Sequence, residues 1–331
     1  WDSPAREWIP TSATAAMEKG GNVLLPHNTL EVIGVVWDSP ARILRGMDLD
    51  PLFCCIVLML LVAFLCWLLS VIMHNYSQVD RIWSLVPWLY AWVFVAYSMR
   101  EEEGPNARLL LMALLTTVWG IRLTYNFHRK GGYDMKEEDY RWPALRETMH
   151  PILFQVFNVF FIALYQNVLL LSFSALPTAV AWQYRDVPLS TADYVVAGLF
   201  AAVWIIEVVA DEQQWRFQTE KWRLRNAGKP PVTADQARGF LTEGIFRFSR
   251  HPNFWAEQSV WWSYYLFSVT SSGQWLNYSL AGAVQLSLLF QGSTDYTEKL
   301  SLKKYPVYAD YQRCTSRLMP WFPGKMPAKT E

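Results

Sequence analysis

The chain has 331 residues, of which 52% are hydrophobic and 16% aromatic, and its formal net charge is +0. Soluble domains are about 45–50% apolar even when Gly is counted, so this higher value, which omits Gly, points away from that class. Zero net charge disfavours nucleic acid as a partner, because phosphate binding needs a surplus of basic residues. We expect no metal either, since the cysteines have the spacing of neither metal ligands nor a disulfide framework: Cys54, Cys55, Cys66 and Cys314.

The first 50 residues differ in character from the rest of the chain. They are mixed and punctuated by Gly and Pro without a clear hydrophobic period, which predicts a poorly ordered arm. The hexapeptide Trp-Asp-Ser-Pro-Ala-Arg occurs at 1–6 and again at 37–42, and one repeated hexapeptide is not the period of a repeat protein. We expect residues 51–323 to form one membrane domain and residues 324–331 to form a short tail.

Long apolar blocks alternate with charged segments over the rest of the chain. Because a backbone in lipid must satisfy its own hydrogen bonds, such blocks predict an all-α, polytopic bundle in a lipid bilayer. The clearest span is 51–73, which has no charged residue. Six to seven transmembrane helices are expected in total, the others at 82–97, 109–127, 152–176 and 194–210 and in a helical hairpin formed by 254–269 and 275–290.

Lys and Arg residues are distributed unevenly between the segments that join these spans. If the spans alternate and the last hairpin returns to its starting side, the loops 127–151 and 211–253 share one side with the C-terminal segment, and this side holds most of the basic residues. Basic loops of membrane proteins face the cytoplasm. We therefore predict a multi-pass membrane protein in which these two loops and the C-terminus are cytoplasmic.

The segment 241–262 places several polar side chains beside a hydrophobic span: Arg247, Arg250, His251, Asn253 and Glu257. Pro252 favours the start of a helix within this group. A helix N-terminus next to arginines suits an anion such as a phosphate, a pyrophosphate or a carboxylate. The alternative is a basic anchor for lipid headgroups, although the asparagine and the glutamate contribute nothing to an anchor.

Glu207 and Asp211 lie one helical turn apart at the end of the predicted span 194–210. Like charges at this spacing repel each other, and a carboxylate near or within the bilayer either needs a partner or serves a function. We consider Arg216 and Arg250 as partners. A structural ion pair is the alternative to a functional site.

Further polar residues lie near the ends of spans. Tyr305, Tyr308 and Tyr311 recur at three-residue spacing, as residues of an interfacial aromatic belt or as groups that bind a nucleotide by hydrogen bonds and stacking. Asp80 and Arg122 flank spans on the same predicted side, where they pair with each other or line a cavity. The chain has no Gly-x-Gly-x-x-Gly motif, phosphate-binding loop or zinc pattern, so we expect helix ends and loops to hold any cofactor.

Several short segments together resemble one known family. The most specific is 244–257, Gly-Ile-Phe-Arg-Phe-Ser-Arg-His-Pro-Asn-Phe-Trp-Ala-Glu, and the others are Val79-Asp80-Arg-Ile-Trp83, Trp119-Gly-Ile-Arg-Leu, Glu138-Asp-Tyr-Arg, Ala210-Asp211-Glu-Gln and the ending Tyr-Pro…Met-Pro-Trp-Phe. Over residues 52–323 the chain is similar to the steroid 5-alpha-reductase-like superfamily. Within it, the chain most resembles the broad branch of uncharacterised membrane proteins with a domain like the C-terminal domain of 3-oxo-5-alpha-steroid 4-dehydrogenase.

This resemblance implies an all-helical membrane enzyme that holds NADPH on its cytosolic side, in the endoplasmic reticulum if the organism is a eukaryote. By the resemblance, Asp211, Asn253, Glu257 and Tyr305 lie where family members contact this cofactor. The residues expected beside them are Arg216, Arg247, Arg250, His251 and Tyr308. The implied reaction is reduction of a carbon–carbon double bond, conjugated to a carbonyl, in a sterol or other lipid, with a hydride from NADPH and a polarising acid at the oxygen.

The chain departs from the family pattern in two places. Steroid reductases hold the ketone with a Glu and a Tyr from early helices, and the candidates for these catalytic residues here are Asp80 and Tyr125. The family has Gly between an aromatic residue and Glu257, whereas this chain has Trp255 and Ala256 before it. A side chain at this position crowds a close approach of the backbone.

Two other functions are compatible with the same pattern. Membrane methyltransferases of the isoprenylcysteine and phospholipid type share the Arg-His-Pro pattern and bind S-adenosylmethionine, whose carboxylate suits the same Arg and His. A non-catalytic membrane scaffold with the same fold is the third hypothesis. A scaffold needs no acid near the arginines, so Asp211, Asn253 and Glu257 argue against it, and the methyltransferase hypothesis predicts binding of S-adenosylmethionine in place of NADPH.

Overall fold

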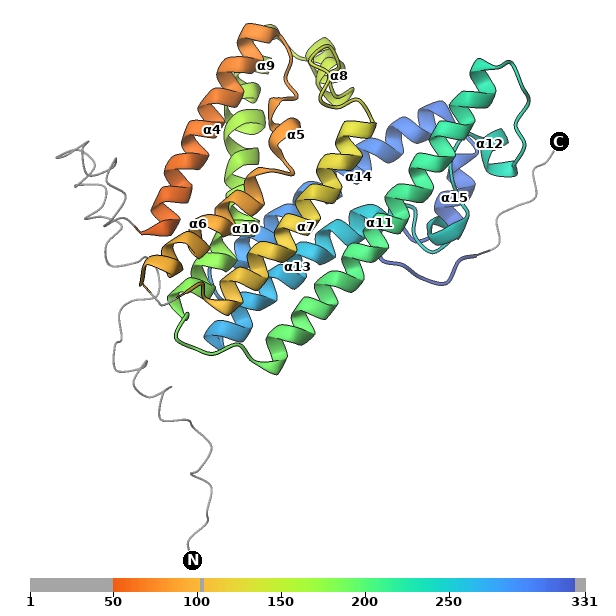
Figure 1. Cartoon of the computed structure of the whole chain (residues 1–331). Helices are drawn as coiled ribbons and strands as arrows, with labels where there is room; N and C mark the ends of the chain where they lie inside the picture. Colours follow the sequence, from red (N-terminus) through yellow and green to blue (C-terminus); the bar gives the residue numbers. More distant parts are fainter. Residues whose placement is uncertain (1–49, 102–103, 325–331) are drawn as a thin grey trace, which may run out of the picture. The chain divides into compact units, whose positions relative to one another are not determined.

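The computed structural model describes residues 50–101 and 104–324 (Figure 1). The arm predicted for residues 1–50 and the tail predicted for residues 324–331 therefore lie outside the described residues, apart from Asp50 and Gly324. The chain divides into two units, 1–53 and 54–331. The second unit contains all the described helices except the first three residues of α4 (Pro51–Met73).

Every regular element in the described residues is a helix, as the all-α prediction requires. One of them, η1, is a π-helix that continues α9 and leads directly into α10, and η2 is a 3₁₀ helix. After α4 the elements are α5 (Gln78–Ile82), α6 (Val86–Glu101), α7 (Ala107–Arg129), α8 (Arg141–Thr148), α9 (Pro151–Phe157), η1 (Asn158–Tyr165), α10 (Gln166–Gln183), α11 (Thr191–Asn226), α12 (Ala234–Arg238), η2 (Gly244–Arg247), α13 (Pro252–Ser272), α14 (Leu280–Lys304) and α15 (Tyr308–Cys314).

Four helical segments are long and apolar enough to cross a bilayer: α4, α7, the continuous segment 151–183 and α11. They coincide with four of the predicted spans and support a membrane protein. The predicted spans at 82–97, 254–269 and 275–290 are also helical, as α6, α13 and α14. However, α6 has only 16 residues, and α13 and α14 are rich in polar residues, so these three helices do not reach the length or apolar character of the other four.

α10 is surrounded by other helices of the bundle. It contacts α6, α7, α13 and α14, and nearly all its side chains are buried, which is typical of a helix that other helices surround. A small residue permits the close crossing with α14, because a Cβ atom on Gly282 would fall on the backbone of Ser172 and Phe173. The backbones of α10 and α14 therefore touch where the two helices cross.

The segment 151–183 changes its winding at η1, where the backbone has π turns. Such turns are frequent at functional sites. Asn158 at the start of η1 is fully buried, and its Nδ2 donates a hydrogen bond to Ser70 Oγ of α4 at 2.9 Å. This polar contact joins α4 to the central segment.

α11 positions the acidic pair noted in the sequence. Its start is fixed because Asp193 accepts hydrogen bonds from Arg108 (2.9 and 3.1 Å), from Thr270 (2.6 Å) and from the capping residue Ser190. At 1.5 Å per residue, its 36 residues extend about 54 Å, well beyond a hydrocarbon core of about 30 Å. Glu207 lies about 24 Å along the helix from its first residue, and the helix continues beyond it.

Candidate functional site

Four charged residues from three helices meet inside the bundle, and we call them the Arg122 cluster: Arg122 of α7, Glu207 and Asp211 of α11, and Glu257 of α13. Arg122 Nη1 lies 2.6 Å from Asp211 Oδ2. Arg122 Nη2 lies 2.5 Å from Glu207 Oε1 and 3.8 Å from Glu257 Oε2. The contact with Glu207 is an ion pair without hydrogen-bond alignment, because Nη2 makes no hydrogen bond. Each of the four residues is at most 9% exposed.

The helical period explains why these side chains converge. Each helix presents residues three or four positions apart, which lie on one face. These residues are Trp119, Arg122 and Asn126 on α7, Glu207 and Asp211 on α11, and Asn253, Glu257 and Trp261 on α13. Because α11 packs against both α7 and α13, the three faces meet.

Asp211 is held by two amides as well as by Arg122. Asn126 Nδ2 donates to its Oδ2 at 2.8 Å, and Asn253 Nδ2 donates to its Oδ1 at 3.4 Å. The second bond is long, and a side-chain amide has two N–H donors and a carbonyl acceptor, so Asn253 has capacity for a further partner. Asp211 and Asn253, both predicted to contact a cofactor, are therefore in contact with each other.

Glu257 accepts a hydrogen bond from an indole at each carboxylate oxygen. Trp119 Nε1 donates to Oε2 at 3.0 Å, and Trp261 Nε1 donates to Oε1 at 2.9 Å. The two indole rings pack edge to face with their centroids 4.8 Å apart, and both side chains are fully buried. The rings exclude water from this carboxylate, and their N–H groups fix its orientation.

The Arg122 cluster contains three carboxyl groups and one guanidinium, so it has two negative charges in excess when all of them are ionised. Burying charge without compensation is costly. Among the described residues, two further buried atoms of the cluster lack a hydrogen-bond partner, Arg122 Nε and Glu207 Oε2. Excess charge and unused hydrogen-bonding atoms at one buried point indicate a functional site.

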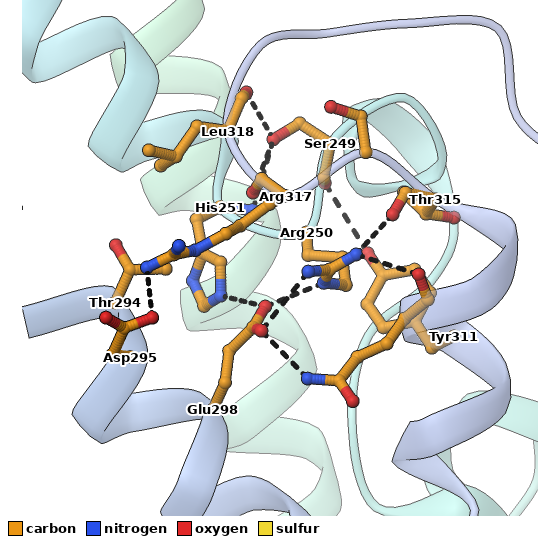
Figure 2. Close-up of polar contacts among 12 residues, drawn as sticks. Ser249, Arg250, His251, Thr294, Asp295, Glu298, Tyr311, Thr315, Arg317 and Leu318 are labelled. Carbon is orange, nitrogen blue, oxygen red and sulfur yellow. Dashed lines mark hydrogen bonds and ion pairs between the residues drawn. The ribbon is translucent and has the colours of Figure 1, made fainter. Parts of the chain in front are cut away.

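A second polar cluster lies beside the start of α13 and comprises Arg250, His251, Glu298 and Gln312, and we call it the Glu298 cluster. Figure 2 shows Arg250 and His251 directed at Glu298. Arg250 donates to both carboxylate oxygens of Glu298, at 2.6 and 3.1 Å. His251 Nε2 lies 3.0 Å from Oε1, and Gln312 Nε2 donates to Oε2 at 2.8 Å. Burial raises the pKa of Glu298, but the hydrogen bonds from these three residues outweigh burial and lower it to about 2.

The Glu298 cluster attaches the C-terminal segment to α13 and α14. Arg250 Nη1 donates to the backbone carbonyls of Gln312 (3.1 Å) and Thr315. Figure 2 also shows Arg317 directed at Asp295 of α14, with which it forms an ion pair of 2.6 Å. The arginine that precedes the Arg-His-Pro histidine bond therefore has internal partners, and its contacts stabilise the fold where the sequence predicts an anion site.

The other residues predicted to bind a cofactor lie outside the Arg122 cluster. Arg216 pairs with a glutamate one turn earlier on α11 (2.7 Å), and Arg247 lies over the ring of the phenylalanine that follows it, 5.3 Å from the ring centroid. Tyr305 and Tyr308 both contact Phe240, with ring centroids 5.9 and 5.0 Å away. These two tyrosines thus pack in one aromatic group.

The two residues predicted as catalytic, Asp80 and Tyr125, have separate surroundings. Asp80 accepts hydrogen bonds from Trp142 (3.0 Å) and Arg141 (3.3 Å), and burial raises its pKa while the charge of Arg141 opposes this. Tyr125 is 61% exposed, and the guanidinium of Arg129 lies 5.3 Å from the centroid of its ring. No hydrogen bond or ion pair in the described part of the chain joins either residue to the Arg122 cluster.

The partner of the α11 acids was not recognised from the sequence. The two arginines considered for this role, Arg216 and Arg250, pair with other carboxylates, and Asp80 pairs with Arg141 rather than with Arg122. The sequence did carry a signal, because Arg122 interrupts the predicted span 109–127. An arginine inside a span is costly unless an acid within the bundle pairs with it.

Comparisons with known proteins place both clusters within a shared family region. The profile of a family described as "Protein of unknown function (DUF1295)" matches residues 66–315. The uncharacterized protein C594.04c of Schizosaccharomyces pombe is 38% identical over 264 residues, which cover 78% of this chain and 76% of that protein. No solved structure matches.

Proposed function

This chain belongs to the DUF1295 family of proteins of unknown function, and we propose that it is a membrane-embedded reductase that uses NADPH to reduce a carbon–carbon double bond in a sterol or other lipid-like enone. One observation carries the proposal. Asp211, Asn253 and Glu257, which the resemblance to steroid 5-alpha-reductase-like proteins assigns to the cofactor, meet around Arg122. Asp211 and Asn253 are 42 residues apart in the chain, so the fold alone brings them together.

The donor and acceptor groups of the cluster fit the nicotinamide end of this cofactor. Asp211 accepts hydrogen bonds, Asn253 donates and accepts them, and Arg122 Nε is an unused donor, which together complement a carboxamide. Bound NADPH would supply the hydride. The excess negative charge disfavours phosphate groups within the cluster, so these groups belong beside the basic cytosolic part of α11, near Arg216 and Lys221.

We also propose that α6, α13 and α14 complete a bundle of six to seven membrane spans. The support is their packing against α10, because helices that lie along a buried span share its depth in the bilayer. In this arrangement the loops 127–151 and 211–253 and the C-terminus are cytoplasmic. In a eukaryote the protein would reside in the endoplasmic reticulum.

The methyltransferase alternative places the carboxylate of S-adenosylmethionine against Arg250 and His251. Glu298 already supplies a carboxylate to both of these side chains, so this position is less suited to a second one. For this reason the reductase is the better supported of the two activities. A scaffold without catalysis leaves the charge excess of the Arg122 cluster without a purpose.

Cofactor binding to the detergent-purified protein tests the proposal. We expect NADPH to raise the melting temperature more than NADH or S-adenosylmethionine does. Asp211→Ala and Asn253→Ala should each reduce the NADPH shift while the protein stays folded, and Glu220→Gln on the same helix, which disrupts only a surface pair with Arg223, should not. Selective binding of S-adenosylmethionine would favour methyl transfer, and binding of none of the three by folded protein would favour a scaffold.

A further inference from the structure

The proposed reduction adds a hydride to one carbon and a proton to the next, so it needs an acid near the cofactor residues. Asp80 and Tyr125 lie outside the Arg122 cluster. Within the cluster, Glu207 is the carboxyl group with the fewest partners, and it is 3% exposed. It lies one turn before Asp211 on α11, on the same face.

The hydrogen bonds around the two glutamates leave one place for a proton. Both oxygens of Glu257 accept from indole N–H groups. Glu207 Oε1 lies against Arg122, whereas its Oε2 has no donor among the described residues. Arg122 Nη2 lies 2.5 Å from Glu207 Oε1 and 3.8 Å from Glu257 Oε2, so the two carboxyl groups flank one guanidinium nitrogen. Two carboxylates that share a site in this way repel each other unless one of them holds a proton.

The surrounding charges lead to the same conclusion. The guanidinium of Arg122 from α7 lies against Glu207, and the same guanidinium also faces Asp211 on α11 and Glu257 from α13. One guanidinium serves three carboxyl groups, so a single proton removes one of the two excess negative charges. Asp211 is the least suitable site for this proton, because it already accepts hydrogen bonds from Arg122 and two asparagines.

We propose that Glu207 and Glu257 share one proton in the resting protein and that this acid pair is the proton donor of the reduction. The second half of this proposal rests on the proposed function. Bound NADPH would supply the hydride from a C–H bond of its dihydronicotinamide and would be oxidised to NADP⁺, while the carbon–carbon double bond of the substrate would be reduced to a single bond. The hydride would form a C–H bond at one carbon of the double bond, and the Glu207 O–H bond would break as its proton forms a C–H bond at the neighbouring carbon. Both glutamates are then ionised, and the pair regains a proton from water before the next turnover.

Infrared spectroscopy of the purified full chain tests the shared proton without any cofactor. A protonated carboxyl group has a carbonyl band that shifts when H₂O is replaced by D₂O. We expect such a band in the wild type at neutral pH and a weaker band in Glu207→Gln, and Glu257→Gln serves as a second variant should the first not fold. Glu220→Gln is the matched control on α11 and should leave the band unchanged. A wild type without this band, or a folded variant of the pair that retains all of it, would overturn the shared proton.

NADPH oxidation in the presence of a sterol enone, with cholest-4-en-3-one as the probe, tests the donor role. We expect Glu207→Gln to lower turnover about 100-fold or more and to leave the NADPH thermal shift in place, whereas Asp211→Ala should weaken that shift. A Glu207→Gln variant with wild-type turnover would overturn the donor role. A wild type that neither binds NADPH nor reduces the enone would overturn the proposed function and the donor role with it, and the infrared result would still decide the shared proton.

Discussion

The Glu298 carboxylate accepts hydrogen bonds from three side chains and is nearly inaccessible to water, so its removal leaves Arg250 buried without a counter-charge. We expect Glu298→Gln to lower the free energy of unfolding at neutral pH by about 3–5 kcal/mol. Asp295→Asn is the matched control on the same helix, because the Asp295 side chain is 59% exposed in its pair with Arg317 and such surface pairs contribute about 1 kcal/mol or less. Thermal unfolding in detergent measures both, and equal losses would contradict the structural role of the Glu298 cluster.

The same carboxylate also sets the pH dependence of this stability. Burial opposes ionisation, but the hydrogen bonds keep the pKa of Glu298 at about 2 in the folded protein, against an ordinary value of 4.5. At a pH between these two values, the unfolded chain holds a proton on Glu298 and the folded protein does not. The stabilisation that ionised Glu298 gives is therefore complete above the ordinary pKa and is lost as the pH falls toward 2. The difference in melting temperature between the wild type and Glu298→Gln should therefore shrink below about pH 4.5. A difference that stays constant down to pH 2 would contradict the lowered pKa.

At the scale of residues, the sequence predicts which side chains share a helical face but not which faces meet. The spacing of Glu207 and Asp211 places them together on one helix, and the resemblance adds Asn253 and Glu257. The partner Arg122 lies 89 residues before Asp211 in the chain, and the packing of α7 on α11 selects it. Local spacing carries no information about such a distant pair, so the arginines nearer in sequence were considered in its place.

At the scale of elements, the crossing of α10 and α14 depends on one missing side chain. A methyl group at Gly282 would meet the backbone of Ser172 and Phe173, which cannot move aside as a flexible side chain does. We expect Gly282→Ala to cost about 1–3 kcal/mol of stability from overpacking. Gly292→Ala on the same helix is the control, because nothing lies within 4 Å of its added methyl group, and it should be neutral or stabilising, since Ala favours helix over Gly. Thermal unfolding measures the stability of both variants. A Gly282→Ala protein as stable as the wild type would show that α10 and α14 do not pack tightly at this crossing.

The end of a helix could be predicted from the sequence where the helix and its apolar block terminate at nearly the same residue. The predicted span 51–73 has the bounds of α4, and α7 extends two residues beyond each end of 109–127. α11 instead continues 16 residues past the predicted end at 210. The part of α11 beyond residue 210 is charged, and Glu–Arg pairs at helical spacing stabilise it, as between Glu212 and Arg216. Hydropathy locates the bilayer, whereas charge pairing allows a helix to continue outside it.

At the scale of the whole molecule, α13 connects the two polar clusters. Its first residues follow Arg250 and His251 of the Glu298 cluster, and one turn further Glu257 enters the Arg122 cluster. The sequence placed all of these residues in one predicted anion site. The structure separates them, because the 3.6-residue period directs them to different neighbours, α14 and the C-terminal segment for the first group and α7 and α11 for the second.

The two ends of the bundle have different polar networks. At one end Asn106 donates to the carbonyl of Arg185 (3.0 Å), close to the buried pair of Arg108 and Asp193. At the other end Arg129 pairs with Glu212 at 2.7 Å, and the Glu298 cluster holds the C-terminal segment. The loops rich in Lys and Arg emerge at this second end, and the topology that we propose from the positive-inside rule has this end in the cytoplasm.

Labelling of single cysteines tests this orientation. The exposed positions chosen are Lys136 and Lys229 at the basic end and Asp186 and Gln274 at the opposite end, each replaced by cysteine in a chain whose four native cysteines are changed to alanine. In sealed microsomes with their cytosolic face outward, a membrane-impermeant maleimide should label Lys136→Cys and Lys229→Cys at once, and Asp186→Cys and Gln274→Cys only after permeabilisation. The distribution of Lys and Arg requires an even number of crossings between residues 250 and 300, which is met by no crossing or by two. Labelling of Gln274→Cys together with the basic-end pair would select no crossing, so α13 would not cross the bilayer.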